Sequence, residues 1–279
     1  MRISYLLLSF STIILFSCQK EIESPTTTNS GSNNNNATKL VKIVQKSGAD
    51  SSVVTFTYNT AGKLIGFTTK EKEAGNAFEN NKIIVRNSQG IIQKIIRKGT
   101  VLIQNGIDSI ISNVHYDPTS QRYTSWALSY QLFGDIIRDS VELLYNTAGK
   151  VLTALAYEDI GVGTYKQNTR FDYTYTGNNF KARKLSTLYS GTFSEDFTIT
   201  EEFDSKISPL ILGNEAFVLD FAVSFYSANN TTKTTVTNPS DPTDIYTIAY
   251  TYNSANKPLT ALYTLTPGNA SFTYNYYYQ

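Results

Sequence analysis

The sequence predicts an all-β fold, a long antiparallel meander of repeated β-hairpins in a curled or barrel-like sheet. Three observations support this prediction: a turn motif repeats, apolar and polar residues alternate beside each copy, and the copies recur at a regular spacing. The hexapeptide Tyr-Asn-Thr-Ala-Gly-Lys occurs at 58–63 and again at 145–150, and a variant, Tyr-Asn-Ser-Ala-Asn-Lys, occurs at 252–257. The repeating unit is therefore interpreted as a β-hairpin.

The repeated motif has the chemistry of a type I turn. Asn59 and Asn146 stand at the first position, where a side-chain oxygen can accept a backbone hydrogen bond, and Gly62 and Gly149 stand at the fourth, where φ is positive. Asn256 takes the fourth position in the third copy, and Asn is the non-glycine residue that best tolerates this conformation. The same rule predicts further left-handed residues at 90, 179 and 230, and a related turn at 116–118.

The predicted turns recur about every 26 to 30 residues, which is room for two strands of typical length. The meander should therefore have up to about fourteen strands. Val54, Phe56 and Tyr58 alternate with Thr55 and Thr57, so one face of the sheet is apolar and aromatic and the other is polar. A sheet this wide with one apolar face must curl or close on itself, because a flat one would leave that face wet and its edges unpaired.

Two kinds of connection complete the expected fold. Residues 207–221 break the hairpin rhythm with an apolar stretch, which is interpreted as a long crossover covering an open end or edge of the sheet, with a flap over a cavity as the alternative. The connections opposite the Tyr-Asn turns, at 70–81, 131–140, 157–168 and 232–244, are expected to be longer and more varied.

The first residues predict a lipid anchor. Arg2 precedes an apolar run that ends near Phe16, as in a secretory leader, and Cys18, the single cysteine, follows Ser17. This arrangement resembles the lipobox of bacterial lipoproteins, which implies that residues 1–17 are a signal peptide and that Cys18 is lipidated and binds the bilayer. Residues 18–38 then form a flexible tether rich in Thr, Ser and Asn, and residues 39–279 a single all-β domain.

The charge balance bears on the expected binding partners, and the residues after Cys18 bear on the expected location. Loss of the leader removes Arg2 from the 24 basic residues, which then match the 23 acidic ones, so no nucleic acid partner is expected. The start Gln19-Lys20-Glu21 resembles the export signal of Bacteroidota lipoproteins. This implies an outer-membrane location, with the cell surface favoured over the periplasmic face.

Catalytic chemistry finds little support in the sequence. His115 is the only histidine, which excludes two-histidine zinc sites, and no nucleophile elbow is present. We interpret His115 as an ordinary residue near a hairpin end. Glu195 and Glu201 fall in phase on one predicted strand, but six residues of continuous strand would separate them by roughly 20 Å, too far for glycoside hydrolysis.

Two further groups have alternative interpretations. Asn238, Asp241 and Asp244 could ligate calcium, but Pro239 and Pro242 between them favour a stiffened turn. The alternating tyrosines at 274, 276 and 278 could stack on sugars, or form a last strand packed on the core. The sequence therefore assigns no catalytic, cofactor-binding or metal-ligating residue, and no cofactor.

The Tyr-Asn-x-x-Gly-Lys copies, each followed by an apolar residue such as Leu64 or Val151, resemble YD or Rhs-type repeats. More closely they resemble repeat-bearing lipoproteins of unknown function from Bacteroidota. The segment Phe203-Asp-Ser-Lys-Ile-Ser-Pro209 is similar to a Tyr-Asp-x-Lys-x-Asn-Pro segment of those proteins. The resemblance spans residues 40–279 and implies a fold unit, with no catalytic residues to carry over.

Three function classes follow. The first is a non-catalytic binding or structural module anchored in the cell envelope, whose partner would be a glycan or an envelope protein. The alternatives are a carrier of an apolar ligand in a curled-sheet cavity and a carboxylate-based hydrolase. Any ligand site is expected opposite the Tyr-Asn turns, with Tyr157 and Tyr165 as the first candidate contacts.

Overall fold

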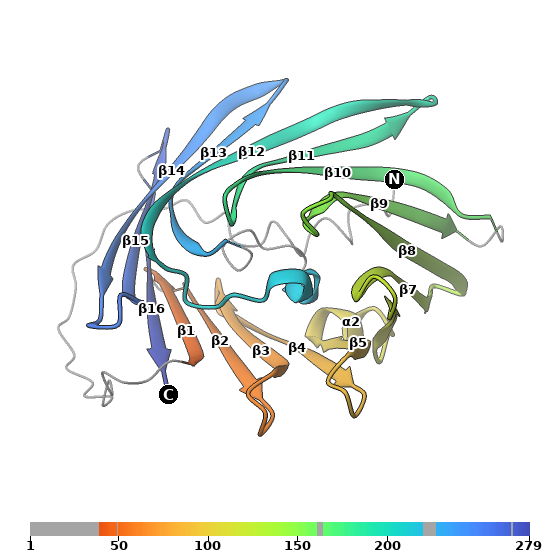
Figure 1. The fold of residues 1–279 in the computed structure, drawn as a ribbon, viewed down its shortest axis with the longest axis horizontal. Coiled ribbons are helices and arrows are strands. Elements are labelled where there is room, and N and C mark those ends of the chain that lie inside the picture. The colour runs from red at the N-terminus through yellow and green to blue at the C-terminus, as the bar shows by residue number, and fades with distance from the viewer. Residues whose placement is uncertain (1–38, 49, 161–163, 220–226, 269) are drawn as a thin grey trace.

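The computed structural model describes residues 39–48, 50–160, 164–219, 227–268 and 270–279. In these ranges sixteen strands form one closed antiparallel barrel (Figure 1). Each strand pairs with its neighbours in the sequence, and β1 pairs with β16 to complete the ring. The predicted all-β meander is confirmed, and of the two predicted forms the sheet adopts the closed one.

The strands of the first half are β1 (Leu40–Ser47), β2 (Asp50–Tyr58), β3 (Leu64–Glu73), β4 (Asn76–Arg86), β5 (Ile92–Gly99), β6 (Ile110–Asp117), β7 (Arg122–Leu132) and β8 (Asp135–Tyr145). Those of the second half are β9 (Val151–Ile160), β10 (Lys166–Thr176), β11 (Asn179–Tyr189), β12 (Thr192–Ile207), β13 (Asn229–Asn238), β14 (Asp241–Tyr252), β15 (Pro258–Thr266) and β16 (Ser271–Tyr278). A short helix, α2 (Thr100–Gln104), and a 3-10 helix, η1 (Gly213–Leu219), complete the described elements.

One end of the barrel, here named the turn rim, carries the connections that start at residues 59, 87, 118, 146, 177, 208 and 253. These connections join fourteen strands, the number expected from the turn spacing. The remaining two are β1 and β16, whose outer ends meet at the same rim, where Lys39 and Gln279 exchange backbone hydrogen bonds of 3.1 and 2.9 Å. The prediction of about fourteen strands missed this terminal pair because no turn joins it.

The predicted turn chemistry is present at the turn rim. The Gly62 amide donates to the Asn59 carbonyl at 2.9 Å, and the Asn59 side chain accepts from the Lys63 amide at 2.9 Å. Gly62 has φ 77° and Asn256, its counterpart in the variant copy, has φ 59°. The turns at 87–90 and 146–149 have the same hydrogen bonds.

Two predicted left-handed positions, 179 and 230, are wrong. The left-handed residue between β10 and β11 is Gly177, with φ 56°, whereas Asn179 is already in β11. Asn230 lies within β13 and is buried, with its backbone and side chain bonded to Asp204. In the turn after Tyr116, Gln121 has φ 55°. The two-residue turn between β10 and β11 therefore has its positive φ at Gly177, two residues before the position that the Asn rule predicts.

The other end of the barrel, the opposite rim, is tighter than predicted. Three hairpins turn through two residues of positive φ, Ala74–Gly75, Phe133–Gly134 and Ser190–Gly191, a geometry that matches the twist of the flanking strands. The ranges 70–81, 131–140 and 232–244 are therefore mostly strand, and their prediction as long connections is wrong. In the fourth range, 157–168, strand β9 continues to Ile160 and β10 begins at Lys166.

The alternation of the sequence separates an inner from an outer wall. Phe56 is 5% exposed and its ring lies 6.2 Å from that of Phe67 on the next strand, so this face belongs to the core. The outer wall carries polar contacts and apolar side chains. Thr251 and Thr260 join hydroxyls at 2.7 Å and Lys233 pairs with Glu202 at 2.8 Å, while Ile83, Leu144 and Leu262 are 42–46% exposed there. No helix in the described ranges is long and apolar enough to cross a bilayer.

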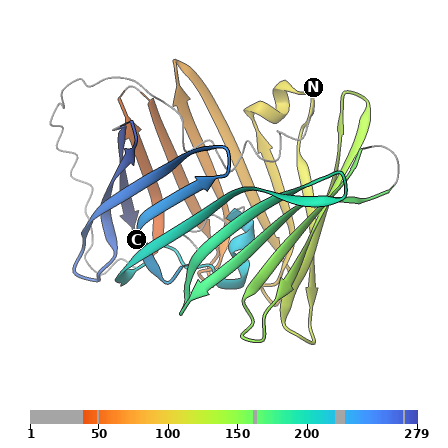
Figure 2. The same ribbon diagram turned by 90° about the horizontal axis from the view of Figure 1, so that it is seen from above.

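The crossover from β12 to β13 turns inward at the turn rim (Figures 1 and 2). Its helix η1 buries Ala216, Phe217 and Val218 against the inner wall. The Phe217 ring stacks on Trp126 at 5.3 Å and meets the edge of Tyr123 at 5.1 Å. The described part of the crossover thus packs against the inner wall, and whether it acts as a cover or as a flap stays a prediction.

Candidate functional site

The repeated tyrosines hold the turn rim together. Four rim tyrosines donate their hydroxyls to a backbone carbonyl at the start of the preceding strand, 18 to 24 residues earlier. The pairs are Tyr58 with Leu40 at 2.7 Å, Tyr145 with Tyr123 at 2.6 Å, Tyr175 with Val151 at 2.7 Å, and Tyr278 with Pro258 at 2.9 Å. The tyrosine of the motif thus bridges two strands.

A cation covers each of these rings. It comes from the end of the turn one unit earlier, or, in the case of Lys39, from the residue before β1: Lys39 over Tyr58 at 5.7 Å, Arg122 over Tyr145 at 5.1 Å, Lys150 over Tyr175 at 5.1 Å, and Lys257 over Tyr278 at 5.5 Å. Such contacts favour a cation over the ring face. We call the hydroxyl bond and the cation together a rim latch. The Tyr and Lys side chains of the hexapeptide therefore hold neighbouring strands of the barrel together, and any ligand contacts come from other residues.

One unit replaces the tyrosine with Arg86. Its guanidinium donates to the Leu64 carbonyl, at 3.1 Å from Nε and 2.9 Å from Nη2, in the place of a tyrosine hydroxyl. It also forms a bidentate pair with Glu215 of η1 at 2.8 and 2.7 Å, and only 5% of the Arg86 side chain is exposed. Tyr123 donates to the same carboxylate at 3.2 Å. The hairpin unit that has Arg86 in place of tyrosine therefore anchors the crossover through Glu215.

A second anchor lies at the other end of the crossover. Tyr252 and Asn230 both donate to the carboxylate of Asp204, and the Lys206 ammonium donates to the Asn256 side chain at 2.8 Å. Asp204 and Lys206 belong to the Phe203–Pro209 segment for which the sequence analysis noted a family resemblance. The segment joins the crossover to the neighbouring turn.

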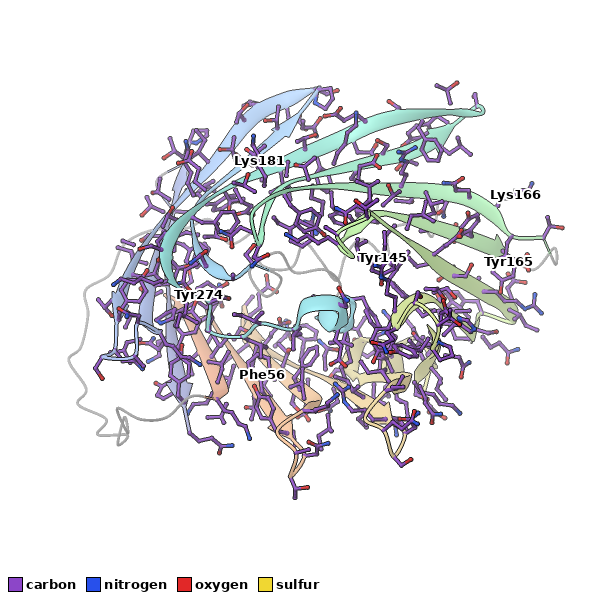
Figure 3. The ribbon with its side chains drawn as sticks, in the orientation of Figure 1. Phe56, Tyr145, Tyr165, Lys166, Lys181 and Tyr274 are labelled. Carbon is purple, nitrogen blue, oxygen red and sulfur yellow. The ribbon has the colours of Figure 1, made fainter. Side chains whose placement is uncertain are left out.

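The inner wall over β14, β15 and β16 is aromatic. Tyr263 stacks on Phe272 at 5.0 Å and meets Tyr274 edge-on at 5.0 Å. Tyr250, Tyr263 and Tyr274 face inward in a closed ring, yet each keeps accessible surface. Figure 3 shows Tyr274 and Phe56 on the inner side of the wall. The prediction of a last strand packed on the core is confirmed.

The tyrosine hydroxyls of this wall are neutral at physiological pH. Burial raises the pKa of Tyr263 to about 12, and raises the pKa of Tyr250 and Tyr274 above the ordinary value. A wall of neutral phenols offers flat apolar faces together with hydrogen-bonding groups. Such a surface suits ligands that are partly apolar and partly polar.

Glu195 and Glu201 lie on opposite walls. A β-bulge between Leu185 and Ser186 shifts the register of β11 and β12, so Glu195 faces outward and pairs with Lys184 at 2.7 Å. Glu201 faces inward, accepts a hydrogen bond from Thr234 at 2.9 Å, and has its pKa raised to about 7 by burial. The expectation that the two share one face is wrong because it assumed a continuous strand. Glu201 also lines an open groove of about 330 Å³ with Asn179, Lys181 and Asp204.

The inner wall brings together a carboxylate pair that sequence reasoning missed. Asp139 on β8 and Glu158 on β9 are direct cross-strand partners. Asp139 is 5% exposed, and burial followed by the charge of Glu158 raises its pKa to about 7. Arg97 faces inward on β5 and opposes this rise. Only the strand register places these residues together, and no local sequence signal reveals it.

The remaining predicted residues are scattered. His115 lies on the outer wall with Nδ1 2.7 Å from the Thr124 hydroxyl, and Asn238 and Asp241 bond to each other in the β13–β14 turn. Tyr157 lies on the outer face of β9 with its hydroxyl 3.3 Å from Glu142, and Tyr165 precedes β10 and is 45% exposed (Figure 3). Cys18 lies outside the described residues.

No protein-family model and no curated protein matches this sequence. Two solved structures share the fold. A porin-like protein from Bacteroides uniformis ATCC 8492 is 17% identical, with a TM-score of 0.53 over 87% of this chain and 99% of that one. A porin-like protein from Bacteroides vulgatus ATCC 8482 is 9% identical, with the same TM-score and coverage. At these identities the likeness shows a common barrel architecture.

Proposed function

We propose that this chain is a lipoprotein of the cell envelope whose barrel is a non-catalytic binding module. The porin-like neighbours support an envelope barrel. In this proposal Cys18 holds the protein in the outer membrane, at the cell surface.

The observation that carries the binding function is the aromatic inner wall. The inner face of the closed ring carries the half-buried Tyr250, Tyr263 and Tyr274, and Glu201 on β12 and Arg183 on β11 also face inward. A purely structural barrel would fill its interior with apolar side chains. Partly accessible aromatic rings beside inward charges instead suit a ligand of mixed polarity.

Trp126, the only tryptophan, reports on this interior because its ring stacks on Phe217 inside the turn rim. Titration with the neutral aromatic probe N-phenyl-1-naphthylamine should saturate and transfer energy from Trp126 to the probe. Tyr274→Ala should weaken binding at least threefold, whereas Tyr277→Ala, on the outer face of the same strand, should leave it unchanged. Equal loss in both variants, or no saturable binding, would reject an interior site.

The anchor has its own test. Cys18→Ser should release the folded protein from membranes, because acyl chains supply the durable part of the attachment. The measurement is the share of protein that sediments with membranes after a high-salt wash, with Ser17→Ala as the control. A variant that still sediments would contradict the lipoprotein assignment while leaving the barrel's binding function standing.

A glycan or envelope protein could also contact the barrel from outside. Tyr157 and Tyr165 flank the β9–β10 connection at the opposite rim and remain the candidate contacts there. Replacement of residues 161–165 by Gly and Ser should weaken binding to labelled envelope glycans, while a swap of the 146–149 turn for another Asn-Gly hairpin should not. The reverse result would place the contact at the turn rim.

A further inference from the structure

A group of unpartnered oxygens occupies one patch of the inner wall on β8, β9 and β10. Both carboxylate oxygens of Asp139 are closed to solvent and have no hydrogen-bond partner, and the same holds for the Oδ1 atom of Asn168. All three atoms are acceptors. A buried acceptor without a partner is costly, so what this patch requires is a donor or a cation.

Glu158 connects these atoms. It is the direct cross-strand partner of Asp139, and its Oε2 atom accepts a hydrogen bond from the Asn168 Nδ2 atom at 3.0 Å. Side chains so paired have Cβ atoms about 4.5–5.5 Å apart, and like charges in this arrangement repel each other. Asn168 is the extra residue of a β-bulge between Gln167 and Thr169, which adds its side chain to the inner-wall pair. The bulge therefore completes a set of two carboxylates and one amide.

From this arrangement we propose that Asp139, Glu158 and Asn168 bind a calcium ion. Calcium takes carboxylate oxygens and amide carbonyls, with water completing the shell, and it tolerates irregular geometry. Its bonds to oxygen are about 2.3–2.6 Å long, shorter than the roughly 2.7 Å of a hydrogen bond to water.

The surrounding charges are compatible with a divalent cation. Tyr130, beside the site, has its pKa raised to about 12, first by burial and then by the charges of Asp139 and Glu158. Arg97 is the opposing charge and acts on both Asp139 and Tyr130, but it makes no ion pair with either carboxylate. Lys166 is the cross-strand partner of Glu158 on β10 and is exposed, whereas Asp139 is buried and has Arg97 as the basic group that acts on it. No third Asp, Glu, His or Cys joins the patch within the described ranges, so the amide must supply the third ligand.

Terbium, which replaces calcium and emits when a nearby aromatic ring is excited, provides the direct assay, with Tyr130 as the donor. Excitation of the full chain at the tyrosine band should give saturable terbium emission that calcium displaces. Calcium should also raise the thermal unfolding midpoint by about 5 °C or more at saturation, and magnesium should not match this effect.

The variants Asp139→Asn and Glu158→Gln should each abolish the terbium emission and the calcium-dependent shift. Asp172→Asn is the matched control, since this carboxylate lies on the outer wall against Arg170 at 2.8 Å, and it should keep both signals. Absence of saturable emission in the unaltered protein would overturn the proposal. So would an equal response to magnesium, or a calcium shift that persists in both inner-wall variants.

Discussion

The hydroxyl of a rim tyrosine makes one hydrogen bond, to a backbone carbonyl of the neighbouring strand. Tyr145 donates to the Tyr123 carbonyl at 2.6 Å in a half-buried position, and burial raises the pKa of Tyr145 to about 12. Loss of the hydroxyl leaves a backbone carbonyl without its partner, which costs more than the bond itself contributes.

Tyr145→Phe should therefore destabilise the barrel by about 1–2 kcal/mol, measured as the free energy of unfolding in urea. Tyr157→Phe is the control, because that hydroxyl reaches an exposed carboxylate at 3.3 Å on the outer wall. Its effect should stay within about 0.5 kcal/mol. Equal costs for the two variants would show that the rim latch adds nothing specific.

Gly149 combines two constraints. Its φ of 77° disfavours a side chain, and a Cβ there would lie 3.1 Å from the Nη2 atom of Arg122, the cation of the neighbouring latch. Gly149→Val should cost on the order of 2 kcal/mol or more, because a branched residue is strained in this conformation and displaces the guanidinium. Asn256→Gly should be neutral or slightly stabilising. Unfolding midpoints by circular dichroism would decide, and an unchanged Gly149→Val would refute the turn geometry.

Among the elements, the crossover depends on one exceptional unit. Arg86 replaces the rim tyrosine, keeps its bond to Leu64, and adds the bidentate pair with Glu215. Removal of one partner leaves a buried charge, so Glu215→Gln should destabilise the protein by about 2–4 kcal/mol. Arg86→Tyr combined with Glu215→Gln should recover part of this loss, since a tyrosine can take the Leu64 carbonyl as it does in the other units.

A double-mutant cycle of Arg86→Tyr and Glu215→Gln measures this coupling directly. The two single changes should sum to more than the double change by at least about 1 kcal/mol. Strict additivity would mean that η1 is held by Phe217 and its aromatic neighbours alone, and that the ion pair is incidental.

The same elements show what the sequence could predict. Gly62 and Asn256 were predicted correctly because the turn rule depends on adjacent residues alone. The predictions of left-handed turn positions at Asn179 and Asn230 were wrong. Asn179 follows a two-residue turn and Asn230 follows a long crossover, and the turn rule describes neither connection. The faces of Glu195 and Glu201 depend on a bulge, and the Asp139–Glu158 pair depends on the register of two strands. Neither the bulge nor the register can be predicted from a local stretch of sequence.

For the barrel as a whole, the buried acids set the response to pH. Asp139 and Glu201 each have a folded pKa of about 7, well above the roughly 3.9 and 4.3 of the unfolded chain. The folded state therefore holds more protons between these values, and its extra stability is complete below about pH 4 and lost as the pH rises through about 7.

In the presence of a chelator, the unfolding free energy should fall by on the order of 2 kcal/mol between about pH 5 and about pH 8. Asp139→Asn should flatten part of this slope. Glu195→Gln should not, because Lys184 and Thr198 lower the pKa of Glu195 and its titration lies below this window. A slope that is unchanged in Asp139→Asn would show that the carboxyl is charged throughout.

The seam between Lys39 and Gln279 has a consequence for how the barrel could be oriented. The two ends of the wall exchange the same backbone bonds as any hairpin, and a latch of the common kind, Lys39 on Tyr58, stands beside them. The ring thus has no privileged starting point. A circular permutant with a short link across the seam and new ends at Phe133–Gly134 should rebuild the same wall. In the proposed lipoprotein, a tether moved to the new N-terminus would leave from the opposite rim, so the crossover end would face away from the membrane.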